Sequence, residues 1–376
     1  MHRLALSLLL LTMAMPAAWS QTALPFLEIA PSELGGAGVA RPDVQTFVQN
    51  PALLGLSAVS TRAAASGTPT VGWLGELSYG TGSALVGGEV GPLAMGVGTA
   101  QGELVGEPRT LGDGTPYQPM DRYRALGVGV ATRGPIRLAA GITGRHITTT
   151  DAPVFDGERF SSLELGGASL DVGVAASADI GALTTLPTLG SVEPALTVRA
   201  GYGQTHISGE VQYSGFGPMP LPRTAALGWS ATAGLDLPTK RGSLRLAELE
   251  VAAQAERSLV RMDEQRYAGV LGGLSPLHAV AGIGDDATTG RRGVRFVLAE
   301  TFAFSAGRYD GWGYDDVRSR TTEVRARGVL HLLTNALGRS VGDIGQRADL
   351  RLSWETAYAG TPDVSTRTRI TLVVRP

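Results

Sequence analysis

Residues 223–236 read RTAALGWSATAGLD, and their side chains alternate between two kinds. The odd positions from 225 to 235 are apolar, with Leu227 and Trp229 at the centre, whereas the even positions from 228 to 236 are small or polar. Successive side chains of a β-strand point to opposite faces. This period of two therefore predicts a strand with one apolar and one polar face.

The same pattern recurs along the chain, with charges gathered on one face. It is clearest at 136–146, 247–256, 323–332, 349–358 and 367–374. If the polar faces line a lumen, its candidate polar residues are Glu248, Glu250, Glu323, Arg325, Arg327, Arg351 and Glu355. One pass along the sequence gives fourteen strands, at 57–66, 70–79, 83–90, 92–101, 122–133, 135–148, 163–180, 194–208, 223–236, 243–257, 293–306, 320–334, 346–358 and 364–374.

Two stretches allow a different division into strands. Residues 267–284 could form a further hairpin that turns at Ser275-Pro276, and residues 292–308 could fold back near Glu300. The short connections of this division also fall at the end where a bacterial barrel has its long outer loops, so some of its boundaries are wrong. We expect about fourteen strands, within two.

A soluble β-sandwich or propeller and a membrane β-barrel both contain such strands. The sandwich buries the apolar faces, whereas the barrel turns them toward lipid. Apolar faces rich in Ala and Gly, long strands, and an alternation of tight turns with long polar loops favour the barrel. An aromatic content of only 6% speaks against a strong aromatic girdle. The fold class we predict is all-β, a transmembrane antiparallel barrel.

The first twenty residues, MHRLALSLLLLTMAMPAAWS, have the composition of a secretory signal peptide. A short basic start precedes an apolar run too short to span a bilayer, and small residues occupy the positions before a cleavage site. No later stretch is continuously apolar for the length of a transmembrane helix, so an exported membrane protein of this sequence must span as a closed barrel. We expect 1–20 to be a cleaved signal peptide and the protein to reside in the outer membrane of a Gram-negative bacterium.

The composition gives no sign of catalysis. A net charge of −2 argues against nucleic acid as a partner, and the chain has no cysteine. The histidines of the mature chain have no metal-ligand spacing, and the acidic pairs Glu248/Glu250 and Asp285-Asp286 are typical of solvated charge. We therefore expect no metal, no cofactor and no enzymatic activity.

The segment before the first strand does not alternate. It contains Phe26-Leu27-x-Ile29, then Gly35-Gly36-Ala37 with Val39-Ala40, then Asn50-Pro51-Ala52 and Leu56. These elements resemble the N-terminal signature of the PorV/PorQ family of outer-membrane barrels. That family is itself similar to the FadL fatty-acid channel, in which an Asn-Pro-Ala element follows an N-terminal plug. A second stretch, GVRF at 293–296 with FAFSAGRY at 302–309, resembles the late hairpin of the PorV/PorQ family.

The chain departs from the family pattern in several places, among them a spacing to Asn50 that is one residue short and the insertion of Leu53-Leu54 before Gly55. Ser32-Glu33-Leu34 stands where the family has Ala-Arg and Gly-Met, and the chain ends without a terminal aromatic residue. The resemblance implies a plug segment at 21–56 that lies in the lumen of a barrel formed by 57–376. It also implies the following plug or gate residues: Phe26, Leu27, Ile29, Gly35, Gly36, Asn50, Pro51 and Ala52.

Three functions stay open at this point. Resemblance to PorV/PorQ implies an accessory component of protein secretion of type IX, whose partners are secretion machinery or a cargo protein bound by long loops at 103–121 and 257–292. Resemblance to FadL implies a passive channel for a hydrophobic small molecule, with an apolar pocket lined by Phe26, Leu27, Ile29, Phe47 and Val48. A soluble periplasmic β-protein is the third. In the secretion role and in the channel role, the outer face of the barrel contacts outer-membrane lipid. Of the three functions we favour the secretion role.

Overall fold

The computed structural model describes most of the chain after the expected leader. The described residues are 34, 37–57, 61–68, 78–106, 108–110, 114, 116–118, 120–150, 154–155, 160–161, 164–183, 191–212, 218–221, 223–239, 242–261, 266–267, 269–311, 314–330, 348–359 and 364–374. Among them, no helix is long and apolar enough to cross a bilayer.

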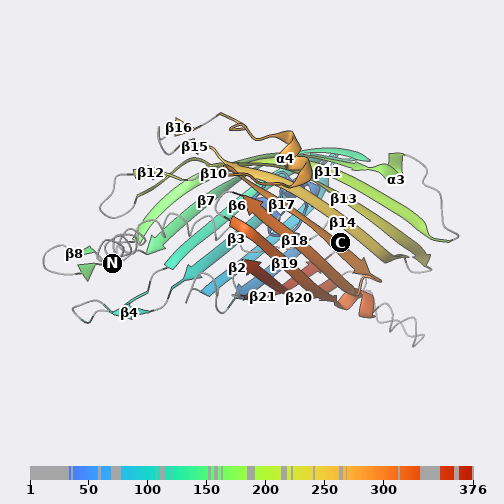
Figure 1. The fold of residues 1–376 in the computed structure, drawn as a ribbon. Coiled ribbons are helices and arrows are strands. Elements are labelled where there is room, and N and C mark those ends of the chain that lie inside the picture. The colour runs from blue at the N-terminus through green and yellow to red at the C-terminus, as the bar shows by residue number, and fades with distance from the viewer. Residues whose placement is uncertain are drawn as a thin grey trace.

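Fourteen long antiparallel strands form a closed ring (Figure 1). They are β1 (Thr61–Thr68), β2 (Ser78–Val90), β3 (Leu93–Val105), β6 (Met120–Thr132), β7 (Ile136–Thr150), β10 (Glu164–Asp179), β11 (Glu193–Gln212), β13 (Thr224–Thr239), β14 (Gly242–Ser258), β17 (Thr288–Leu298), β18 (Phe302–Gly311), β19 (Tyr314–Arg325), β20 (Ala348–Ala359) and β21 (Val364–Val374). Each strand pairs with the next, β10 pairs with β11, and β1 pairs with β21. The ring has no free edge, as a sheet in lipid requires.

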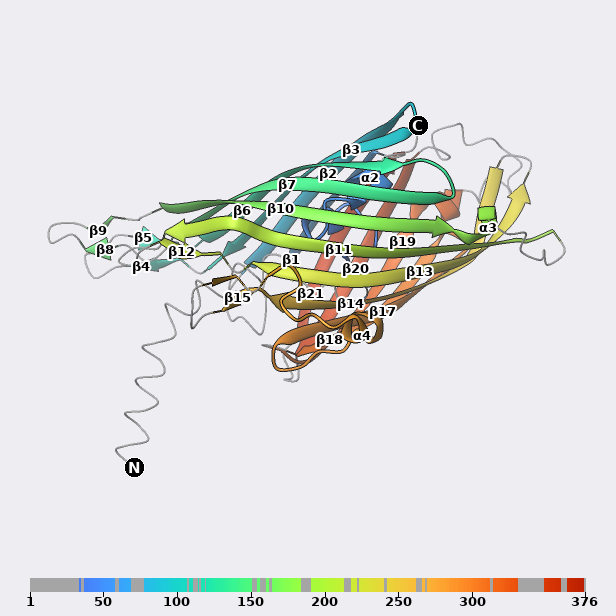
Figure 2. The ribbon, with the colours of Figure 1, turned by 90° about the horizontal axis from the view of Figure 1, so that it is seen from above.

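Short elements decorate the two ends of the barrel. At one end lie the paired strands β4 (Arg109–Thr110) and β5 (Pro116–Tyr117), β8 (Val154–Phe155) and β9 (Phe160–Ser161), and β15 (Val260–Arg261) and β16 (Arg266–Tyr267). At the same end β12 (Pro218–Pro220) pairs antiparallel with the last residues of β11. The helix α3 (Ile180–Leu183) lies at the other end (Figure 2). Inside the barrel are the short helices η2 (Thr46–Val48) and α2 (Leu53–Leu56).

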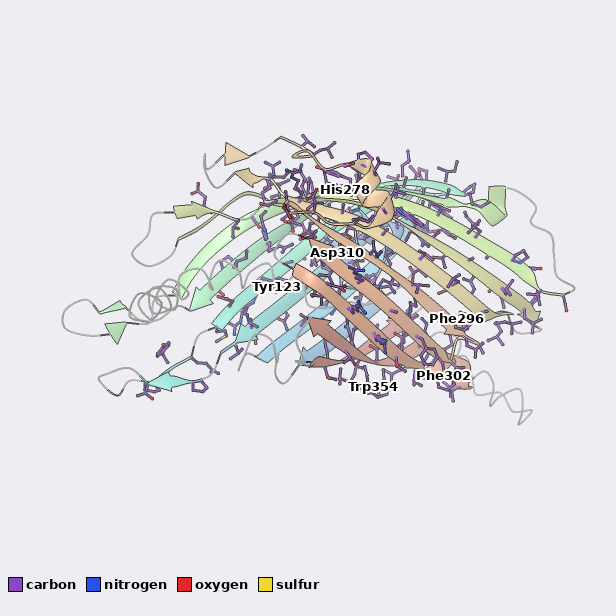
Figure 3. All side chains as sticks on the ribbon, viewed as in Figure 1. Tyr123, His278, Phe296, Phe302, Asp310 and Trp354 are labelled. Atoms are coloured by element: carbon purple, nitrogen blue, oxygen red, sulfur yellow. The ribbon has the colours of Figure 1, made fainter. Side chains whose placement is uncertain are left out.

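The strands alternate in burial with an inverted polarity. On β3 the side chains alternate between exposed and buried, and the exposed ones include Met95 and Val97. Phe296, Phe302 and Trp354, which Figure 3 labels, are each more than two fifths exposed. Charged side chains such as Arg295, Glu323 and Arg369 are at least nine tenths buried. An apolar outer face around a polar interior is the arrangement of a membrane barrel and the reverse of a soluble sandwich, so the predicted fold class is confirmed.

Two of the predicted strand divisions are wrong, and their errors cancel in the count of fourteen. The predicted strand 320–334 is also too long, because β19 ends at Arg325 and residues 326–330 are helical. The described part of the predicted strands 70–79 and 83–90 is one strand, because β2 runs unbroken through Gly80 and Gly82, which pair with β3. The predicted strand 293–306 is two strands. The chain reverses at Ala299 and Glu300, whose φ angles are 49° and 50°, and so confirms the alternative fold-back near Glu300.

With the corrected division, most of the short connections lie at one end of the barrel. Short turns follow β2, β6, β13 and β17 at one end, which we call the turn end, where Thr61 also pairs with Val374. The connections after β3, β7, β11 and β14 are longer and lie at the opposite loop end. Bacterial outer-membrane barrels have short periplasmic turns and longer external loops. The chain departs from this scheme after β10 and β19, whose connections at the turn end are long, and after β18, whose connection at the loop end is short.

The alternative division, with a further hairpin at 267–284, is wrong. The structure has a helix there, α4 (Pro276–Ala281), which begins at Ser275. The hydroxyl of Ser275 accepts from the amide of Leu277, Pro276 occupies the first turn, and Gly282 ends the helix with a φ of 61°. Ser-Pro followed six residues later by Gly is thus a helix start and stop rather than a strand turn.

Candidate functional site: the plug and the lumen

Leu34 and residues 37–57 form a plug that lies across the lumen at mid-height. Asn50 at its centre has no exposed surface. Its side-chain amide donates to the carbonyl of Val39 at 2.7 Å and to the carbonyl of Val174 on β10 at 3.1 Å. Its side-chain oxygen accepts from the amide of Ala52 at 3.1 Å. One side chain therefore folds the plug on itself and fixes it to the wall.

Glycines of the wall let the plug approach the strands at backbone distance. A methyl group added at Gly129 would lie 2.6 Å from the carbonyl oxygen of Pro51, and one at Gly228 would lie 2.8 Å from Val39. We call the ten lumenal glycines with such contacts the plug seat. They come from seven strands and are Gly96, Gly98, Gly127, Gly129, Gly141, Gly173, Gly201, Gly203, Gly228 and Gly293. The unusual glycine content thus has a structural use, since only glycine leaves room for this contact.

Polar side chains of the wall hold the plug backbone. Gln254 accepts from the amides of Gly38 and Val39, both at 2.9 Å. Arg145 donates to the carbonyl of Val48 at 2.9 Å, and Ser230 donates to the carbonyl of Ala40 at 3.2 Å. The plug has little regular structure, so these bonds satisfy backbone groups that would otherwise be buried without partners.

A buried ion pair orients Arg145. Its guanidinium contacts Asp171 at 2.7 Å, and both side chains have no exposed surface. The other oxygen of Asp171 accepts from the amide of His206, which has a φ of 58°, beside an irregular register between β10 and β11. The guanidinium of Arg145 also lies 5.7 Å from the centre of the Tyr123 ring (labelled in Figure 3).

A charged cavity of about 600 Å³ lies between the plug and the turn end. Its lining includes eight arginines and six acidic residues, which are Arg41, Arg199, Arg245, Arg295, Arg325, Arg327, Arg351 and Arg369, and Asp43, Asp236, Glu248, Glu250, Glu300 and Glu323. Glu323 contacts Arg295 at 2.8 Å and Arg325 at 2.6 Å. The network neutralises most of the charge and leaves a small positive excess.

The plug takes part in this network through two residues. The Nε atom of Arg41 lies 3.1 Å from both carboxylate oxygens of Glu250. Asp43 lies 3.6 Å from Arg369 on β21 and 3.5 Å from Arg41. Buried pairs of this kind cost desolvation energy, so they fix position more than they add stability. Arg41 and Asp43 thus tie the plug to two separate wall strands, β14 and β21.

The structure brings most of the predicted site residues to the lumen. Six of the seven predicted lumen residues line the cavity, whereas Glu355 is buried on β20 outside it. Asn50, Pro51 and Ala52 lie in the plug. The remaining predicted gate residues lie outside the described residues and are Phe26, Leu27, Ile29, Gly35 and Gly36.

The apolar pocket expected for a hydrophobic ligand is not formed by the two of its residues that the structure describes. Phe47 is fully buried against Gly98, and Val48 is buried beside it in η2. Arg41, Arg145, Asp171 and Gln254 were missed in the sequence. The alternation of strands 136–146 and 247–256 places Arg145 and Gln254 on the polar face, but only the fold shows which polar residues the plug meets.

Comparisons with known proteins assign no family. No protein-family model and no curated protein sequence matches the chain. Solved structures similar in fold include the toluene transporter TbuX of Ralstonia pickettii, with a TM-score of 0.43 and 10% identity over 93% of this chain and 97% of that one. The toluene transporter TodX of Pseudomonas putida has a TM-score of 0.42 and 9% identity, over 92% of this chain and 96% of that one. The translocator domain of the autotransporter NalP from Neisseria meningitidis has a TM-score of 0.34 and 11% identity, over 84% and 86%. The architecture of the chain follows from its own strand pairing, and these scores say nothing of its activity.

Proposed function

We propose that the protein is a plugged channel of the outer membrane, through which a small molecule passes when the plug shifts. The observation that carries the proposal is the seat of the plug, which spans the lumen and meets seven wall strands. A closed barrel without a plug would be an open pore of fixed selectivity. A separate segment held by hydrogen bonds and two ion pairs can be displaced as a unit.

The lining of the cavity favours a particular class of transported molecule. Eight arginines and six acids make the turn end of the lumen a polar, hydrated space. A polar or amphiphilic molecule fits this lining better than the purely hydrophobic molecule implied by resemblance to FadL. The proposal includes no catalytic step and no cofactor, in line with the expectation from the sequence.

The test is to lock and to loosen the plug in the same barrel. Because the chain has no cysteine, Ala40→Cys and Ser230→Cys introduce the only two thiols. The Ser230 hydroxyl lies 3.2 Å from the Ala40 carbonyl, so a short bifunctional reagent can join the pair. Glu250→Gln removes the carboxylate that holds Arg41.

We expect Glu250→Gln to raise conductance in planar bilayers and cross-linking to abolish that increase. Asp236→Asn is the matched control, since Asp236 lines the same cavity and contacts Arg245 of β14 at 2.6 Å rather than the plug. Equal conductance with a locked and an unlocked plug contradicts the channel.

A role in protein secretion is the second candidate, and the PorV/PorQ-like N-terminal segment supports it. The paired strands β4–β5 and β8–β9 extend beyond the wall at the loop end (Figure 2) and offer a surface for secretion machinery or cargo. On this hypothesis the plug stays seated and the barrel is a scaffold. Removal of residues 107–119 would then abolish secretion of cargo while conductance stays at the wild-type value.

A further inference from the structure

One connection of the barrel folds back onto the outside of the wall. Residues 269–287, which we call the flap, read GVLGGLSPLHAVAGIGDDA and include α4. The helix contacts β13, β14 and β17 and lies outside the ring of strands (Figures 1 and 2). Long external loops normally extend into water, so a loop that covers the wall calls for an explanation.

The flap is fixed to the wall by side chains that point away from the lumen. Tyr202 and Gln204 both donate to the carbonyl of Val270, at 2.5 and 2.6 Å. The indole of Trp229 donates to the carbonyl of Val280 at 3.0 Å. These bonds satisfy carbonyl groups that would otherwise face an apolar environment.

Two arginines of the outer wall also reach the flap. Arg257 donates to the carbonyl of Gly273 at 3.3 Å, and Arg292 donates to the carbonyls of Ala281 and Gly282 at 3.5 and 3.4 Å. A bare arginine on the lipid face of a barrel is costly. The flap accepts hydrogen bonds from both arginines and covers them in part, since the Arg292 side chain stays 37% exposed.

The inner side of the flap is packed and its outer side is apolar. Leu274 and Ala279 are buried in one cluster with Ala225 and Ala255 of the wall. The large side chains turned away from the wall are Val270, Leu271, Leu277, Val280 and Ile283, which are between 46% and 78% exposed. Among these nineteen residues the only charged or titratable side chains are His278, Asp285 and Asp286.

The flap adjoins bare apolar wall toward the turn end, and on the side of β18 and β19 it adjoins the exposed, ion-paired Arg308 and Arg318. On β14, exposed Leu249 and Val251 precede Ala253, Ala255 and the covered part of the strand. The plug gives a second measure of height. Tyr202, which lies between plug-seat Gly201 and Gly203, is bonded to the flap, whereas Val97 between Gly96 and Gly98 is 46% exposed and Val128 between Gly127 and Gly129 is 38% exposed.

From this continuity we infer that the flap is embedded in the membrane, with the acyl chains of the outer leaflet in contact with Leu277, Val280 and their apolar neighbours. The flap is then a second layer of wall over β13, β14 and β17. Asp285 and Asp286 lie where the flap returns to the loop end of β17, and so at the side of the water. The inference requires only a membrane-spanning barrel and is independent of what the lumen conducts.

The absence of cysteine gives a clean test by spin labelling. Leu277→Cys and Val280→Cys carry the label on the flap, Val174→Cys is the reference for bare wall, and Thr110→Cys on β4 is the reference for water. The full chain is reconstituted in vesicles of palmitoyl-oleoyl phosphatidylcholine. Collision rates with oxygen, which concentrates in lipid, and with a water-soluble nickel chelate are then compared.

We expect the spin labels at Leu277 and Val280 to collide more often with oxygen than with the nickel chelate. The label at Val174 should show the same preference, and the label at Thr110 the opposite one. A label at Leu277 that meets the nickel chelate as readily as Thr110 does overturns the inference, since the flap then lies in water. A label that meets neither reagent also overturns it, because protein, such as a second copy of the chain, then covers the patch. Heat-modifiable mobility of each labelled variant shows that the barrel has assembled.

Discussion

Asn50 shows how much a single buried amide does in this lumen. It bonds Val39, Val174 and Ala52, which belong to two parts of the plug and to the wall. The residue before a proline is biased to extended backbone, and a short amide can reach neighbouring backbone groups. The sequence predicts the turn at Asn50-Pro51, but the bond to β10 depends on the closed barrel.

Replacement of Asn50 by alanine should release the plug without opening the barrel. The loss of buried hydrogen bonds destabilises the seated plug by about 2 kcal/mol or more. We expect protease to cleave the plug of Asn50→Ala faster while heat-modifiable mobility is unchanged. Gln45→Ala is the control, because Gln45 bonds only the partly buried Thr81 through its side chain among the bonds described. Equal cleavage of the two variants would contradict the role of Asn50.

The pair of Arg145 and Asp171 is the second contact to test at this scale. Asp171→Asn leaves the buried guanidinium without its carboxylate and should destabilise the folded barrel by about 3–5 kcal/mol. The double variant Arg145→Met with Asp171→Leu should recover much of that loss, since it buries no charge. Urea unfolding in detergent measures both. An Asp171→Asn protein as stable as wild type would show that the ion pair makes no net contribution to the stability of the barrel.

At the scale of elements, the wall and plug are shaped for each other. The plug seat collects glycines from seven strands at the height where the plug backbone passes. Some of these glycines, such as Gly127 and Gly129, occupy alternate positions in one strand, which the sequence pattern places on one face. The sequence alone does not explain these glycines, because glycine weakens a strand. Only the tertiary structure shows that they make room for the plug backbone.

The seat can be tested with two glycines of the same strand. Gly141 of β7 lies against Pro51, whereas Gly144 of β7 has open space where a side chain would be. We expect Gly141→Val to exclude the plug from its seat and to raise plug proteolysis and conductance. Gly144→Val should leave both unchanged, since valine suits an exposed strand position. A Gly141→Val protein with a seated plug would mean that the wall yields instead.

At the scale of the molecule, the fold is an inside-out arrangement of apolar and polar groups. Charged residues from many strands meet in the lumen, and an apolar band surrounds the ring. Closure satisfies the backbone of every wall strand, so the outer face needs no polar partner. The stability of the whole therefore depends on lipid or detergent at that face.

A charge on the outer face should expose this dependence. Phe296→Arg places a guanidinium on the lipid side of β17 and should destabilise the barrel by about 2–4 kcal/mol if it lies near the bilayer centre. Phe296→Leu, which keeps an apolar side chain, should cost far less. Urea titrations of both variants in lipid vesicles check this. Equal midpoints would show that Phe296 does not face lipid.

The sequence by itself determined the class of strand and the side on which each residue lies. A period of two is a local property, so the lumenal positions of Glu250, Glu323 and Arg325 followed from the alternation alone. The turn at Ala299–Glu300 did not, because neither glycine nor proline marks it, and the backbone there has positive φ at non-glycine residues. Glycines at 80 and 82 resembled a turn although pairing with β3 keeps them in a strand.

Only the tertiary structure decided what those faces meet. Closure between β1 and β21 joins residues more than three hundred positions apart, and it brings Asp43 of the plug to Arg369. The position of the flap is equally hidden in the sequence. An apolar loop that packs inside the barrel and one that lies on the outer wall have the same composition. Alternation is encoded in neighbours along the chain, whereas ring closure, plug contacts and flap position depend on residues that only folding brings together.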